Sequence, residues 1–161
     1  RRVKSHGGTL ARDYKTEVYV WEGLWRHWNL QMFDTIAGPR HWVRWACRLY
    51  RTPAPVVRPL SRKDGYSYYW VLDHSLSLRP DHWNVATCLH ETAHAILYHH
   101  MGHAVEDHGR EWLGVYAWLL LKAEMWPNIA LAASARAEGL PWSPSSPTQF
   151  AALAKSIRSN T

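Results

Sequence analysis

The chain has 161 residues and a formal charge of +6, with 47% hydrophobic and 20% charged residues. This length suits one globular domain with a core of its own, and this composition excludes a disordered or low-complexity chain. The basic balance suits an acidic partner such as nucleic acid, although many soluble proteins share it.

Cysteine content and hydropathy bear on the compartment in which the chain works. Cys47 and Cys88 are the only cysteines, too few for a disulfide framework or a four-cysteine zinc site. We therefore expect a reducing, cytoplasmic setting. No apolar run approaches the length of a membrane span, and residues 1–8 lack the apolar core of a signal peptide. The sequence thus predicts no membrane partner.

The N-terminal third of the chain predicts two helices. Aromatic and apolar residues recur every three or four positions between Ala11 and Leu30, which favours an amphipathic helix. Gly38-Pro39 is expected to break the chain before a second helix from His41 to Tyr50. One side of this second helix is basic, which indicates either a solvated face or a phosphate-facing stripe. Its arginines are Arg40, Arg44, Arg48 and Arg51.

The middle of the chain predicts a small sheet. Three prolines restrict Thr52 to Pro59 to an edge strand or a loop. The aromatic and valine residues between Tyr66 and Leu72 form the strongest strand pattern in the chain. Ser75 to Leu78 alternates serine and leucine, which is typical of a half-buried edge strand. Asp81 is then expected to cap the next helix.

The second half of the chain predicts helices. The first runs from about His82 to Tyr98, and the next begins near His108 and continues to about Met125. An alanine-rich helix over 129–138 and a Pro/Ser linker over 141–147 follow. A short basic helix ends near Arg158.

One predicted helix carries the pentapeptide His90-Glu91-Thr92-Ala93-His94, an H-E-x-x-H motif. Four residues of helix turn through about 400°, so both imidazoles emerge on one face, about 6 Å apart along the axis. One zinc ion can bridge two nitrogens at that separation. Glu91 stands beside the metal, where a carboxylate can take a proton from the attacking water. Chance yields this pentapeptide in only about 3% of shuffled sequences, which favours the functional interpretation.

Two histidines do not complete a zinc site, and three candidates compete for the third ligand. His100 has the spacing of a longer motif, but Leu97 replaces its glycine, and a continued helix would turn His100 away from the metal. His108 is preferred because it follows a loop that can return the chain to the metal. Glu111 lies within one turn of His108 and could orient its imidazole. A carboxylate is the third option, from Glu106, Glu111 or Glu124.

Other residues near the motif receive weaker assignments. The group that stabilises the transition-state oxyanion has three candidates, namely Tyr98, Arg110 and Tyr116. His99 and His103 are expected to lie in a solvated loop. The remaining histidines lack metal-ligand spacing and are predicted to be surface or structural residues: His6, His27, His41, His74 and His82.

The stretch from His90 to Trp112 resembles the SprT-like metallopeptidases, which pair H-E-x-x-H with a downstream His-Gly-Pro-Glu-Phe/Trp. Here the second element, at 108–112, is His-Gly-Arg-Glu-Trp, with arginine in place of proline. The whole layout is also similar to small bacterial and phage metallohydrolases that share this motif pair. Their first helix is matched here, more weakly, by Arg12-Asp13, Val18-Tyr19 and Glu22.

The resemblance implies a zinc ion on His90, His94 and His108, with Glu91 as the general base. It also implies a compact zincin-like fold of the minigluzincin type. Some SprT-like proteins cleave proteins crosslinked to DNA, which the basic charge here would suit. Unlike many of them, this chain has no cysteine-rich zinc ribbon after Pro127.

We therefore predict a zincin-like α+β domain over residues 1–126, with helices packed on a short mixed sheet and the motif on a central helix. A C-terminal helical appendage is predicted over residues 127–161. The predicted function is a zinc metallopeptidase whose protein or peptide substrate pairs with the edge strand near Ser75 to Leu78. The alternatives are a non-peptidase metallohydrolase, or a nucleic-acid- or protein-binding module with structural zinc. A structural site would need a fourth ligand, such as His103 or Glu111.

Overall fold

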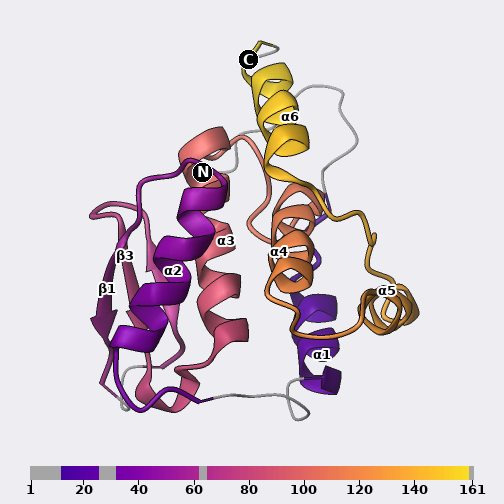
Figure 1. The fold of residues 1–161 in the computed structure, drawn as a ribbon. Helices are drawn as coiled ribbons and strands as arrows, with labels where there is room; N and C mark the ends of the chain where they lie inside the picture. Colours follow the sequence, from indigo (N-terminus) through magenta and orange to yellow (C-terminus); the bar gives the residue numbers. More distant parts are fainter. Residues whose placement is uncertain (1–11, 26–31, 62–64, 160–161) are drawn as a thin grey trace.

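Six α-helices and three short strands follow one another in the computed structural model, which describes residues 12–25, 32–61 and 65–159 (Figure 1). Together they form a small α+β domain, as predicted. No helix in these ranges is both long and apolar enough to cross a membrane. In chain order the elements are α1 (Lys15–Trp25), α2 (Ala37–Leu49), β1 (Val56–Pro59), β2 (Tyr68–Trp70), β3 (Ser75–Leu78), α3 (Val85–Met101), α4 (Arg110–Lys122), α5 (Asn128–Ala137) and α6 (Pro147–Ser159).

The first two helices begin at other residues than the sequence predicted. The helix predicted over 11–30 is observed as α1, and residues 26–31 lie outside the described part of the chain. Gly38 and Pro39 do not break the chain, because they lie in the first turn of α2. Proline is tolerated there since the first N–H groups of a helix have no intrahelical acceptor.

The sheet has the strand order β1-β3-β2, with β1 parallel and β2 antiparallel to β3. The prediction of an edge strand at Ser75–Leu78 is therefore wrong, because β3 is central and all four of its residues are buried. Its leucines pack against α2 and α3, while its serines are covered by cross-strand neighbours on both sides. The prolines correctly placed β1 at an edge, and β2 forms the other edge.

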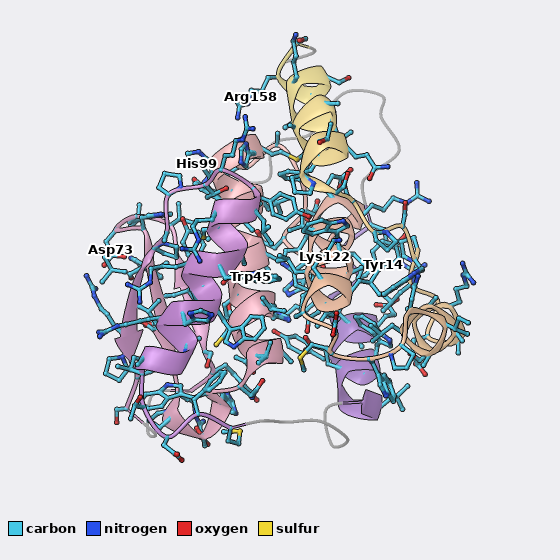
Figure 2. All side chains as sticks on the ribbon, in the orientation of Figure 1. Tyr14, Trp45, Asp73, His99, Lys122 and Arg158 are labelled. Carbon is cyan, nitrogen blue, oxygen red and sulfur yellow. The ribbon has the colours of Figure 1, made fainter. Side chains whose placement is uncertain are left out.

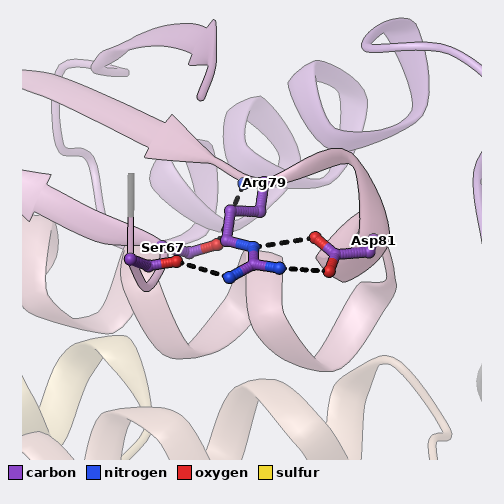
Figure 3. A network of polar contacts seen from close by, with 4 residues as sticks. Ser67, Arg79 and Asp81 are labelled. Carbon is purple, nitrogen blue, oxygen red and sulfur yellow. Dashed lines mark hydrogen bonds and ion pairs between the residues drawn. The ribbon is translucent and has the colours of Figure 1, made fainter. Parts of the chain in front are cut away.

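The start of α3 is fixed by Asn84 rather than by the predicted Asp81. The Asn84 side chain accepts a hydrogen bond from the N–H of Thr87 at 2.9 Å, which satisfies a donor at the beginning of the helix. Asp81 instead lies in a short 3-10 turn, where its carboxylate accepts two hydrogen bonds from the Arg79 guanidinium (Figure 3). Arg79 also donates to the Gly65 carbonyl, so this turn holds the chain that leads into β2.

Helix α3 is the central element of the fold. It contacts α2, β2 and β3 on the side of the sheet, and α4 and α6 on the other (Figure 1). It continues to Met101, one turn further than predicted, and ends at Gly102, whose φ of 59° suits glycine. The H-E-x-x-H motif therefore lies on a central helix, as predicted.

The described part of the C-terminal segment, 127–159, packs into the same hydrophobic core as α3 and α4. Leu131 of α5 and Phe150 of α6 are buried in that core. The Arg158 guanidinium donates two hydrogen bonds to the carbonyl of His100, and Figure 2 shows Arg158 close to the end of α3 that carries His99. The last helix thus holds the C-terminal end of the helix that carries the motif.

Candidate metal centre

Three histidines converge where α3 meets the start of α4. His90 and His94 lie four residues apart on one face of α3, and His108 directly precedes Gly109, the N-cap of α4. Each offers one ring nitrogen, and these atoms all lie within 4.8 Å of one another. Within the ranges that the structure describes, this is the one cluster of His, Cys, Asp or Glu that could hold a metal ion. The structure thus brings together the three histidines predicted from the sequence.

The distance between His90 and His108 matches that of two ligands on one metal ion. The Nε2 atoms of His90 and His108 lie 3.4 Å apart. Two nitrogens bound at about 2.0–2.1 Å to a tetrahedral ion would be separated by about 3.3–3.4 Å. The ring of His94 completes the group, with its centroid 4.7 Å from that of His108. Three imidazoles gathered in this way are a donor set that zinc and similar transition metals prefer.

Burial favours the neutral, metal-binding form of His94 and His108. Desolvation, followed by the proximity of His90 and then of His108, holds the pKa of His94 well below its usual value. Desolvation is also the main cause that lowers the pKa of His108 to about 4. A neutral imidazole has a lone pair for a cation, so the cluster is prepared to bind metal at neutral pH.

A buried carboxylate from α1 orients His90. Glu22 Oε1 accepts hydrogen bonds from His90 Nδ1 at 2.8 Å and from the Tyr116 hydroxyl at 2.6 Å. Because Nδ1 is bound to Glu22, the other nitrogen, Nε2, is directed toward His108. From the sequence, Glu22 is indicated only by the weaker family match, because α1 also contains Glu17 and its pattern does not single Glu22 out.

His108 is less firmly oriented than His90. The prediction that Glu111 orients it is not met, because Glu111 instead lines a separate hollow of about 490 Å³ beside α4. The nearest carboxylate oxygen is Asp13 Oδ1, 3.9 Å from His108 Nδ1, which is too long for a hydrogen bond. Among the described residues, His108 Nδ1 has no hydrogen-bond partner.

Glu91 lies beside the histidines and is only 7% exposed. It lines two hollows that also contain His90 and Tyr19, a larger one of about 220 Å³ and a smaller one of about 40 Å³. The larger hollow, called the cleft below, also contains His94 and His108. Glu91 is not part of the cluster of close ligand atoms, which is the arrangement expected of a general base rather than a ligand.

The other candidate ligands lie apart from the cluster. His100 Nε2 is 3.1 Å from both the Thr52 hydroxyl and the Tyr50 carbonyl, so its ring is directed toward the end of α2. His103 Nε2 contacts the Tyr98 hydroxyl at 2.5 Å. The candidate carboxylates also lie outside the cluster, namely Glu106, Glu111 and Glu124.

The three candidates for oxyanion stabilisation differ in whether they line the cleft. Tyr116 is fully buried and its hydroxyl donates to Glu22, while Arg110 lines the hollow beside α4. Tyr98 lines the cleft. Tyr19, which the sequence indicated only through the weaker family match, stacks its ring on that of His90 at a centroid distance of 5.8 Å and lines both hollows around Glu91.

The arginine stripe of α2 is exposed, as predicted for either of its two interpretations. Arg40, Arg44 and Arg48 point to solvent, and Arg40 and Arg44 line a hollow of about 410 Å³ beside β1. The Arg40 guanidinium donates to the Val57 carbonyl. Binding of nucleic acid to this surface stays a prediction.

Comparison of the chain with protein-family models, curated proteins and solved structures finds no match. The resemblance to SprT-like proteins therefore depends on the motif residues, and the case for the site on its geometry.

Proposed function

We propose that the chain is a zinc-dependent hydrolase that cleaves peptide bonds, with zinc held by His90, His94 and His108. The observation that carries this proposal is a cluster of three imidazoles with a buried glutamate beside it in a cleft. Catalytic zinc sites have three protein ligands and an open position, whereas structural sites are closed by a fourth. Neither His103 nor Glu111, the predicted fourth ligands, belongs to the cluster. The position of the motif on a central helix further supports a zincin-like fold.

The residues around the cluster have separate roles in this hydrolysis. A zinc ion on the three histidines would supply a Lewis acid that polarises the substrate carbonyl. Glu91 accepts the proton of the attacking water and passes it to the leaving amine. Its burial limits competition from bulk water, and Glu22 with Tyr116 keeps His90 in one orientation.

The substrate peptide pairs with the edge of β2 in this proposal, not with β3 as first predicted. β3 is paired on both sides, whereas β2 pairs only with β3 in the described sheet. Tyr68 and Tyr69 of β2 also line the cleft, so a peptide on this edge would pass the histidines. Main-chain hydrogen bonds to an edge strand bind peptides with little dependence on sequence.

The Glu91→Gln substitution tests the mechanism because it keeps the shape of the side chain and removes its basicity. We expect the variant to retain stoichiometric zinc and to lose hydrolysis by about 10²–10⁴-fold, the usual contribution of a general base. Zinc is measured by elemental analysis, and cleavage by mass spectrometry of a peptide library. Glu111→Gln, outside the cleft, is the matched control and should keep full activity. Full activity of Glu91→Gln would contradict the proposal.

A further inference from the structure

One wall of the cleft extends the metal-binding face of α3 and is aromatic and apolar. His90, His94 and Tyr98 follow one another at four-residue intervals, so Tyr98 lies on the same face one turn beyond His94. Tyr69 of β2 stands opposite, with its ring centroid 6.4 Å from that of Tyr98. Val71 also lines this part of the cleft. A substrate side chain beside the reacting carbonyl would therefore meet two rings and an aliphatic group.

Both tyrosines are held by hydrogen bonds at their hydroxyl ends. The Tyr98 hydroxyl contacts His103 Nε2 at 2.5 Å. The Tyr69 hydroxyl contacts His74 Nδ1 at 2.9 Å, and His74 Nε2 in turn lies 3.0 Å from the Pro53 carbonyl. Neither histidine lines the cleft, so each tyrosine of the wall is bonded to a residue outside the cleft. Fixed rings lose little conformational entropy when a ligand packs on them.

The carboxylates that line the cleft disfavour acidic substrate side chains. Among the described residues, no lysine or arginine lines it, although Lys15 lies near enough to help lower the pKa of His94 and of His108. Its carboxylates are Glu91, beside the histidines, and Asp107. An acidic substrate side chain would lose part of its hydration here and would lie near these two carboxylates, so it is disfavoured. The cleft measures about 220 Å³, which suits one large side chain rather than a folded segment.

We propose that this wall selects peptides with a large apolar side chain, aromatic above all, beside the bond that is cleaved. Tyr69, Val71 and Tyr98 are then the residues that determine specificity. Aromatic rings pack well at centroid distances of about 4.5–7 Å, a range that the Tyr69–Tyr98 pair already shows. The inference rests on the proposed function, because it names the substrate class of the same site.

The first test compares blocked peptides that differ only in Phe, Ala or Glu at one position. Zinc-loaded wild-type protein is expected to cleave the Phe peptide with a kcat/KM on the order of 10–200-fold above the Ala peptide, and the Glu peptide least. Calorimetry with zinc-loaded Glu91→Gln measures binding of the same peptides without cleavage and should give the same order. Equal binding of the Phe and Ala peptides, or their equal cleavage, would overturn the inference.

Paired variants test the wall itself. Val71→Phe fills the cleft and should move the preference toward Ala, whereas Leu72→Phe should not, because Leu72 is 87% exposed and does not line the cleft. Tyr98→Ala should reduce the Phe preference at least about tenfold, the effect of losing an apolar contact in a pocket. Tyr98→Phe, which keeps the ring, should restore it. An unchanged preference in both Val71→Phe and Tyr98→Ala, with zinc content and thermal stability intact, would overturn the inference.

The outcomes separate this inference from the function on which it rests. If zinc-loaded wild-type protein cleaves none of the peptides, the proposed hydrolase function fails, and binding to Glu91→Gln still decides whether the wall prefers Phe. If it cleaves all of them equally, the function stands and the inference fails.

Discussion

Helix α3 and the residues that follow it carry two groups of histidines: one group forms the candidate metal site, and the other does not. His90 and His94 each bring one ring nitrogen within 4.8 Å of that of His108. His100 and His103 instead bind separate partners, the end of α2 and the Tyr98 hydroxyl. A high content of histidine therefore does not make a metal site. The helix face, burial and a second element that closes on that face distinguish the first group from the second.

The largest expected difference between the two groups is in zinc content. His108→Ala removes a direct ligand, so we expect zinc affinity to fall by more than the roughly 10–100-fold caused by loss of an outer partner. His100→Ala should leave zinc affinity unchanged, because its ring is bound to Thr52 and Tyr50. Elemental analysis after gel filtration measures both. Stoichiometric zinc in His108→Ala would contradict the assignment of His108 as a zinc ligand.

The next effect concerns the carboxylate that orients the first group. Glu22→Gln retains the shape of the side chain but weakens its hydrogen bond to His90, so zinc affinity should fall by about 10–100-fold. Glu17→Gln is the matched control on α1, because Glu17 pairs with Arg12 away from the cluster. Chelator competition measures the zinc dissociation constants of both variants. Equal constants would show that Glu22 does not support zinc binding.

The protonation of the first group predicts how the metal-free protein responds to acid. The pKa of His108 is lowered from 6.5 to about 4 in the folded chain, chiefly by desolvation. Between these values the unfolded chain binds a proton there that the folded chain does not, so the free energy of unfolding falls as pH decreases. One such proton contributes a slope of up to about 1.4 kcal/mol per pH unit. Urea unfolding of metal-free protein at several pH values measures this dependence. The free energy of unfolding should change less per pH unit in His108→Ala than in the exposed control His41→Ala.

The smallest expected effect is at the start of α3. Asn84→Ala removes the cap and should lower the free energy of unfolding by about 1 kcal/mol. Asp81→Ala removes an exposed pair with Arg79 and should cost less, about 0–1 kcal/mol. Thermal unfolding of both variants compares them, and a larger loss in Asp81→Ala would reverse the assignment of the cap.

The sequence predicted the parts of the site that depend on local spacing. His90 and His94 share a face because of helix geometry. His108 could be placed because it follows a loop and directly precedes the start of a helix. Glu22 could not be found in this way, since its contact with His90 joins two helices 68 residues apart and depends on tertiary packing. Any carboxylate of the chain could have filled that role.

The errors in the sheet and at the start of α3 have similar physical causes. Alternating serine and leucine in β3 looked half-exposed, but the serines are covered because the strand has a neighbour on each side. Asp81 and Asn84 are both good capping residues, and only the turn made by Arg79 and Asp81 decides which of them precedes the helix. In each case neighbouring groups in the folded chain decide the outcome, and the local sequence pattern does not reveal them.

The hydrogen bonds from Arg158 to the His100 carbonyl connect α6 with the helix that forms one wall of the cleft. Proteolytic trimming before α6 would leave that carbonyl without this donor and would uncover the apolar surface on which Phe150 packs. Helices without such support fray from their ends, and fraying of α3 would reach Tyr98 within one turn. Loss of α6 would therefore loosen the substrate wall before it disturbed the histidines.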